Sequence, residues 1–110
     1  IAPNGISIDV KTDAGNFKPK PTYEALVEDR GGMGPQLCHI YCFSHVLYDL
    51  SEVWLVGWDF QHTFYQTAQH RKKGERRESM KTGKVLESYY FKTYDQIQGM
   101  SNFLQGVNDP

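Results

Sequence analysis

The segment that most constrains the fold is Glu52–Phe60, with the sequence EVWLVGWDF, because it is apolar on both alternating faces except at its ends. Valine and tryptophan favour extended backbone, and a strand without a polar face must be covered on both sides. We therefore expect this segment to be a central strand of a sheet. The apolar run inside it is far shorter than the roughly 18 residues that a membrane-spanning helix needs, so we expect no membrane partner.

Composition is that of an ordinary globular domain. The chain has 110 residues, of which 39% are hydrophobic and 14% aromatic, and its formal net charge is -1. This size predicts a single domain over residues 1–110 with a hydrophobic core. The near-neutral charge argues against a wholly basic nucleic-acid coat protein, so any nucleic-acid binding must be local. The two cysteines are too few for a disulfide scaffold and favour a reducing, cytoplasmic location.

Hydrophobic patterning predicts the first half of the element order. Residues Gly5–Thr12 alternate between apolar and polar side chains, which is the period of a half-buried strand. We expect Asp13–Gly34 to be mostly a long loop, with one short turn of helix at Tyr23–Glu28. In Pro35–Asp49, apolar and aromatic residues recur at spacings of three and four after a proline that suits a first helical position. This pattern predicts an amphipathic helix.

The second half of the sequence predicts two strands, a charged connection between them and a closing helix. His62–Gln69 and Val85–Lys92 are expected strands, and the charged segment His70–Lys84 between them fits a solvated connection or a short exposed helix. Thr93, with Gln96 three residues later, has the pattern of a helix N-cap. Apolar residues then recur at helical spacing: Ile97, Met100, Phe103, Leu104 and Val107. The complete order predicts an α+β fold, a mixed β-sheet with two main amphipathic helices packed on it.

Asp9 and Lys11 are the first candidates for chemistry. They are two residues apart on a predicted strand, so both side chains project from one face. A carboxylate beside an ammonium can bind a divalent cation through the carboxylate, while the ammonium activates a water or stabilises charge on a phosphate. A solvated strand face of Ser7, Asp9 and Lys11 explains the tripeptide equally well.

The wider context resembles the second half of the PD-(D/E)XK nuclease core, as in RecB-type exonucleases and some restriction endonucleases. That family has a strand ending in an acidic residue, any residue, lysine and often threonine, followed by a helix that opens with Gln-Leu and carries a nearby tyrosine. The matching residues are Asp9, Lys11 and Thr12 for the strand, and Gln36, Leu37 and Tyr41 for the helix. The spacing from glutamine to tyrosine is five here, whereas the family has four. The resemblance covers residues 5–60.

The resemblance implies a metal-dependent nuclease that hydrolyses phosphodiester bonds, a candidate deoxyribonuclease with Mg²⁺ as its cofactor. Asp9 and the carbonyl of Val10 would be metal ligands, and Lys11 would activate the attacking water or stabilise charge on the phosphate. Gln36 would orient substrate or water at the active-site end of the helix. The implied catalytic residues are therefore Asp9, Lys11 and Gln36.

The chain departs from the family at one ligand. Such nucleases carry a further acidic ligand on a strand before the Asp-x-Lys strand, whereas only residues 1–4 precede it here. Two explanations stay open: an acid of the following loop substitutes for it, or the chain is a truncated piece of a longer nuclease-like domain, active or inactive. The acids in that loop are Asp13, Glu24, Glu28 and Asp29.

A basic segment provides a candidate nucleic-acid contact. Its members are Arg71, Lys72, Lys73, Arg76 and Arg77. A projecting basic connection can bind the phosphate backbone without reading sequence. Glu75 and Glu78 dilute the charge, and a run of charges is also typical of a solvated loop.

Two weaker patterns have simpler explanations. Cys38, Cys42 and His45 fall on one face of the predicted helix, with Asp49 beyond them, and these side chains are zinc ligands in other proteins. Three ligands on one straight helix converge badly, so we expect buried cysteines that act as small apolar residues. The Gly31–Gly34 cluster is expected to be a flexible hinge rather than an anion site.

Two alternatives to a nuclease follow from the same residues. The chain could be a non-enzymatic α+β binding module that holds a ligand or a protein on its aromatic sheet or glycine-rich loop. It could also be a homo-oligomeric accessory protein, such as a homodimer, in which one sheet edge pairs with a second copy. Metal binding that depends on Asp9 separates the nuclease from both alternatives.

Overall fold

The computed structural model describes residues 5–31, 38–74 and 87–102. These residues form two three-stranded sheets and one short α-helix. The first sheet contains β1 (Ile8–Gly15), β3 (Ile40–Leu47) and β4 (Val53–Phe60). The second contains β2 (Glu24–Glu28), β5 (Gln69–Arg71) and β6 (Tyr89–Thr93). The helical elements are α1 (Gln61–Thr67) and the 3₁₀ turns η2 (Tyr94–Gln96) and η3 (Met100–Asn102).

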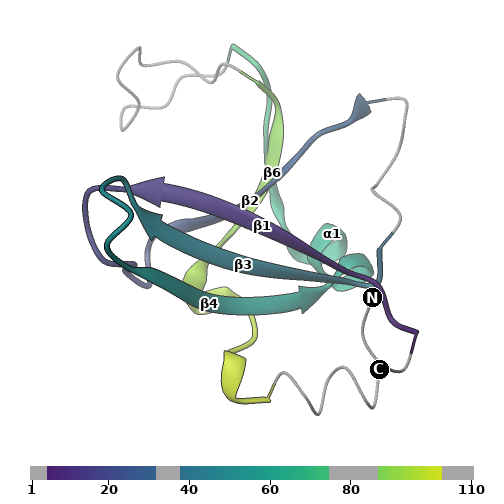
Figure 1. Ribbon diagram of the computed structural model, residues 1–110. Coiled ribbons are helices and arrows are strands. Elements are labelled where there is room, and N and C mark those ends of the chain that lie inside the picture. The colour runs from purple at the N-terminus through teal and green to yellow at the C-terminus, as the bar shows by residue number, and fades with distance from the viewer. Residues whose placement is uncertain (1–4, 32–37, 75–86, 103–110) are drawn as a thin grey trace.

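The two sheets differ in topology. In the first, the order is β1-β3-β4, with β1 parallel and β4 antiparallel to the central β3. In the second, the order is β2-β6-β5 and both pairings are antiparallel. Figure 1 shows β2 and β6 crossing behind the first sheet, with α1 near one end of β3 and β4.

The core lies between the two sheets and is built on β3. Tyr41 and Phe43 of β3 share one buried cluster with Ala25 and Val27 of β2 and with Phe64 of α1. The opposite face of the first sheet buries a second cluster: Ile6, Ile40 and Trp58. Because β3 is central in its sheet and covered on both faces, it holds the edge strand β1 in a fixed position. The candidate site is on β1.

The expected α+β fold with two main amphipathic helices is wrong, because the described residues are mainly strands. The segment Pro35–Asp49, predicted as a helix, contains β3, while its residues 35–37 lie outside the described part. Every residue from Ile40 to His45 is buried, as expected of a strand covered on both faces. Periodicity cannot separate a short buried helix from a buried strand, and the isoleucine, tyrosine, phenylalanine and valine content favours the strand.

The segment Glu52–Phe60 forms a strand as predicted, but it is an edge strand and not a central one. Val53 and Leu55 have 63% and 60% of their surface exposed. The central place is taken by β3, which pairs with strands on both sides. The apolar run therefore correctly predicted a strand, but it did not predict that this strand would lie at the edge of its sheet, with β3 in the centre.

Two shorter segments form a different type of element from the one predicted. Tyr23–Glu28, expected to include a turn of helix, contains β2, which pairs with β6 along its whole length. His62–Gln69, expected to be a strand, lies mostly in α1. Phe64 is the buried residue of this helix, and its ring packs edge-on against Tyr41 with centroids 5.7 Å apart. Long-range packing overrides the weak local preference in both segments.

The predicted cap at Thr93 is confirmed, but it opens a short turn instead of a long helix. The Thr93 N–H donates to Gln96 Oε1 at 3.0 Å, which completes the capping box of η2. The chain then extends, and Gln98 and Trp58 exchange two backbone hydrogen bonds of 2.9 and 2.8 Å. A Cβ on Gly57 would lie 2.5 Å from the Gln98 carbonyl oxygen, so this close approach requires glycine.

Other predictions are confirmed or fall outside the structure. Gly5–Thr12 overlaps β1, and Val85–Lys92 overlaps β6, so both strand predictions are confirmed in part of their length. Residues 75–84 of the charged connection, residues 85–86 of the strand predicted after it, and residues 103–107 of the predicted closing helix lie outside the described residues. In the part of the chain that the structure describes, no helix is long and apolar enough to span a membrane.

Candidate functional site

The structure brings Asp9 and Lys11 together on β1. Among the described strands β1 pairs only with β3, so it lies at the edge of its sheet. The Lys11 ammonium nitrogen is 2.9 Å from Asp9 Oδ2, and the two side chains are 25% and 27% exposed. The sequence predicted that both would project from one face of a strand, and this ion pair confirms it.

The pair leaves one carboxylate oxygen unsatisfied. Asp9 Oδ2 is enclosed from solvent and accepts no hydrogen bond from the described residues, so its contact with Lys11 is an ion pair without hydrogen-bond geometry. Most buried polar atoms in native proteins have a hydrogen-bond partner, and an exception requires an explanation. The unsatisfied oxygen has the capacity to accept a donor or to bind a cation.

Tyr41 and Cys38 surround the pair. Tyr41 is opposite Asp9 in the register of β1 and β3, and the Lys11 ammonium is 5.9 Å from the centre of its ring. The Tyr41 hydroxyl donates to the Tyr65 hydroxyl at 3.4 Å, and burial raises the pKa of Tyr41. Burial, followed by the negative charge of Asp9, also raises the pKa of Cys38. Both groups are therefore neutral near pH 7, and neither is a metal ligand in that form.

The other predicted ligands are not assembled around Asp9. Gln36 lies outside the described residues, and Tyr41, the last residue of the predicted helix motif, is on β3. The Val10 side chain is exposed, and its carbonyl remains a predicted ligand. Across the described ranges, no group of three or more histidine, cysteine, aspartate or glutamate side chains could hold a metal ion.

Two of the four loop acids already have side-chain partners. Glu24 Oε1 accepts from Arg71 Nη1 at 2.6 Å, and Asp29 Oδ2 is 2.7 Å from His70 Nε2. Asp13 continues the face of β1 that carries Lys11, and its Oδ1 accepts from the Ala14 N–H at 2.9 Å. The expectation that one of these acids completes a metal site with Asp9 therefore remains a prediction.

The basic segment divides into engaged and exposed residues. Arg71 stacks over Phe91 at 3.8 Å from the ring centre, and it donates to Glu24 and, at 2.9 Å, to the Tyr89 hydroxyl. These contacts hold its guanidinium on the second sheet. Lys72 and Lys73 are exposed and available to a phosphate backbone, whereas Arg76 and Arg77 lie outside the described residues.

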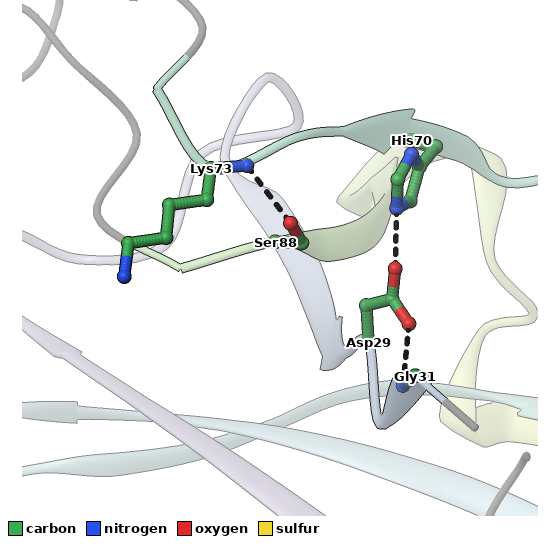
Figure 2. A network of polar contacts seen from close by, with 5 residues as sticks. All are labelled: Asp29, Gly31, His70, Lys73 and Ser88. Carbon is green, nitrogen blue, oxygen red and sulfur yellow. Dashed lines mark hydrogen bonds and ion pairs between the residues drawn. The ribbon is translucent and has the colours of Figure 1, made fainter. Parts of the chain in front are cut away.

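Figure 2 shows a polar network that the sequence did not predict. Asp29 joins two elements, because Oδ2 accepts from His70 Nε2 of β5 at 2.7 Å and Oδ1 accepts from the Gly31 N–H at 2.9 Å. The Gly31 N–H and then His70 lower the pKa of Asp29. Nearby, the Lys73 N–H donates to Ser88 Oγ at 2.8 Å. The Asp29–His70 contact spans β6 and links the residue after β2 to β5, and no local sequence signal pairs residues 41 apart.

A second Asp–Lys pair lies inside the molecule. Lys92 Nζ of β6 is 2.7 Å from Asp59 Oδ2 of β4, and the side chains are 10% and 2% exposed. The pair therefore links the two sheets through the core. Sequence reasoning missed it because Asp59 ends an apolar strand and Lys92 lies in another, with nothing local to indicate that they meet.

The zinc constellation is not formed. Cys42 and His45 are three residues apart on β3, so their side chains project from opposite faces. His45 is buried, and its Nε2–H donates to the Phe17 carbonyl oxygen at 2.9 Å. Both cysteines are free thiols; Cys42 is buried as expected of a small apolar residue, whereas Cys38 is only partly buried.

Comparison with family models, with curated proteins and with solved structures finds no match to this chain. The functional argument therefore depends on the residues themselves. Among those that the sequence singled out, the structure joins Asp9 to Lys11, engages Arg71 within the second sheet, and leaves Lys72 and Lys73 at the surface.

Proposed function

We propose that this chain is a metal-dependent nuclease-like domain that hydrolyses phosphodiester bonds in nucleic acid, with Asp9 and Lys11 at its chemical centre. The observation that supports it is the ion pair at the edge of the first sheet, in which Asp9 Oδ2 lies 2.9 Å from Lys11 and accepts no hydrogen bond from the described residues. An acid with unused acceptor capacity supplies one metal ligand, and the lysine beside it supplies a positive charge for the phosphate.

The residues present fit Mg²⁺ in part. Mg²⁺ is usually held by one or two carboxylates together with substrate phosphates and water, and not by a cage made only of protein. Asp9 would supply one oxygen, and the carbonyl of Val10 is the second candidate. When bound, the ion would activate water and offset charge on the phosphate. Because Asp9 is the main ligand within the described residues, we expect weak metal binding by the free protein and stronger binding with nucleic acid.

Lys11 would act on the phosphate. Its ammonium is on the same face as Asp9, a quarter exposed, and within reach of a phosphate oxygen bound beside that carboxylate. Lysine donates to phosphate as a point charge, which suits an oxygen that becomes more negative during hydrolysis. The exposed Lys72 and Lys73 would add contacts to the backbone that are independent of base sequence.

The proposal is tested with labelled single- and double-stranded DNA and RNA, incubated with Mg²⁺ or Mn²⁺. We expect cleavage by the wild type and a loss of at least about 100-fold in Asp9→Asn and Lys11→Met, the range for removing a general acid, base or charge stabiliser. Glu28→Gln and Lys18→Met are matched controls, because both side chains are exposed and lie outside the pair. These controls should cleave at the wild-type rate.

Folding is measured in the same samples. Removing one partner of a partly exposed ion pair changes the free energy of unfolding by only about 0–1 kcal/mol, so all variants should melt near the wild type. A folded wild type that cleaves no substrate with either metal contradicts the proposal. So does an Asp9→Asn variant that cleaves as fast as its Glu28→Gln control.

A further inference from the structure

A pocket of about 650 Å³ opens between the end of β1 and the start of β2. Its volume is within the range of small-molecule sites. Aromatic rings from three segments line it: Phe17, Tyr23 and Tyr48. Phe17 and Tyr48 are 66% and 65% exposed, so these two rings of the lining are open to solvent. Figure 1 shows that β1 ends beside the connection from β3 to β4. Tyr48 is the first residue after β3.

The pocket rings already contact a cation from the chain itself. The Lys20 ammonium is 5.7 Å from the centre of the Phe17 ring and 5.9 Å from the centre of the Tyr23 ring. Aromatic faces attract ammonium and guanidinium groups within about 6 Å. The two rings therefore have the spacing and orientation to hold one positive charge between them.

The pocket also contains a carboxylate that suits a cationic ligand. Asp13 and Glu24 both line it. Glu24 is engaged by Arg71 at 2.6 Å, so its charge is largely offset. Asp13 is exposed at the end of β1, and its carboxylate is the natural counter-ion for a ligand in the pocket. The buried His45 donates to the Phe17 carbonyl oxygen at 2.9 Å, which ties the backbone at Phe17 to β3.

We infer that this pocket binds an organic cation, an alkylammonium or guanidinium group, with the faces of Phe17, Tyr23 and Tyr48 around it and Asp13 as its counter-ion. The ligand displaces Lys20 from the rings. The cation is either a free small molecule or the side chain of a lysine or arginine from a partner protein. This inference does not depend on the proposed nuclease function, since the pocket lining includes neither Asp9 nor Lys11. Asp13 and Glu24, two of the loop acids considered as metal ligands, do line the pocket, so binding is tested without metal.

The test compares choline with its neutral isostere 3,3-dimethylbutan-1-ol in metal-free buffer, by NMR of the tyrosine ring signals. We expect choline to shift the Tyr23 and Tyr48 signals and to bind about three- to fivefold more tightly than the alcohol. Asp13→Asn should weaken choline binding by a similar factor. Lys20→Ala should strengthen it, because the internal competitor is removed. Glu28→Gln and Lys18→Ala, both exposed and outside the lining, are the matched controls.

Equal binding of choline and the alcohol overturns the inference, and so does a Lys20→Ala variant that binds choline no better than Lys18→Ala. Because Lys20 is exposed, this second comparison remains valid even if Asp13→Asn folds poorly. Methylguanidinium and a short arginine peptide then identify the source. Tighter binding of the peptide supports a partner side chain, equal or weaker binding supports a free small molecule, and no binding of any cation overturns the inference.

Discussion

Two Asp–Lys pairs in this molecule have the same chemistry but opposite surroundings. Asp9 and Lys11 meet at 2.9 Å on a sheet edge, and their side chains are about a quarter exposed. Asp59 and Lys92 meet at 2.7 Å between the sheets, and both are nearly covered. The first pair is partly exposed, although Asp9 Oδ2 itself is enclosed, whereas packed side chains surround the second pair. The same two residue types therefore form a partly solvated pair at a sheet edge and a link between the two sheets in the core.

The comparison shows that burial decides what an ion pair contributes. A buried pair must offset the desolvation of both charges, and removing one partner leaves the other uncompensated. A partly exposed pair contributes little to stability because water solvates each charge well, so either partner can be lost without unfolding the protein. Loss of one residue of the first pair should therefore cost little stability, whereas loss of one residue of the second should cost much more.

The largest effect should come from breaking the buried pair. Lys92→Met leaves Asp59 without its cation and should lower the free energy of unfolding by about 3–5 kcal/mol. Urea unfolding followed by circular dichroism measures this loss. The double variant Asp59→Leu with Lys92→Met removes both charges and should recover most of the stability. A single variant that loses less than about 1 kcal/mol would show that this pair behaves like an exposed one.

A smaller effect is expected beside the buried pair, at Gly57 of β4. Gly57→Ala places a Cβ 2.5 Å from the Gln98 carbonyl oxygen, so the backbone of one segment must move. Overpacking of this kind lowers the free energy of unfolding by about 1–3 kcal/mol. Val10→Ala is the control at the exposed edge, where we expect a change within about 0.5 kcal/mol. Equal unfolding midpoints for the two variants would contradict the tight packing around β4.

A still smaller change in the free energy of unfolding is expected for variants of the exposed pair. Asp9→Asn and Lys11→Met should each change the free energy of unfolding by about 0–1 kcal/mol, because the pair is partly solvated. The measurement is the same urea titration, with Glu28→Gln and Lys18→Met as controls. A loss as large as that of Lys92→Met would remove the distinction between the two pairs.

The smallest effect concerns a third pair, Asp29 and His70, and appears only in acid. The Gly31 N–H and His70 lower the pKa of Asp29 from 3.8, so its ionised form is favoured in the folded state. The resulting stability is present above the unfolded pKa and is lost as the pH falls through the lower folded pKa. In the wild type, the urea unfolding midpoint should fall as the pH drops below 3.8. In Asp29→Asn this fall should be smaller. An unchanged slope in that window would exclude Asp29 as a contributor.

Local features of this fold could be predicted, and long-range ones could not. Asp9 and Lys11 are two residues apart on an alternating strand, so their shared face followed from the sequence. The capping box of Thr93 and Gln96 was equally local. By contrast, the residues of β3 fit helical and extended periods alike, and only its pairing with two strands decides between them.

The same limit applies to the site. Neither the Asp59–Lys92 pair nor the Asp29–His70 pair has a sequence signal, because each joins segments that only the completed fold brings together. The basic segment was correctly identified as charged, but Arg71 proved to be held by Glu24 and Phe91. Charge can be read from a sequence, whereas the partner of that charge depends on the packing of distant strands.

The most direct test of the central claim is the Mg²⁺-dependent cleavage rate of labelled nucleic acid by the wild type and Asp9→Asn, at equal folded fraction. The account predicts cleavage by the wild type, a loss of at least about 100-fold in the variant, and nearly equal unfolding midpoints. Cleavage that survives in Asp9→Asn, or a folded wild type that cleaves nothing, would contradict the assignment of the exposed pair to catalysis.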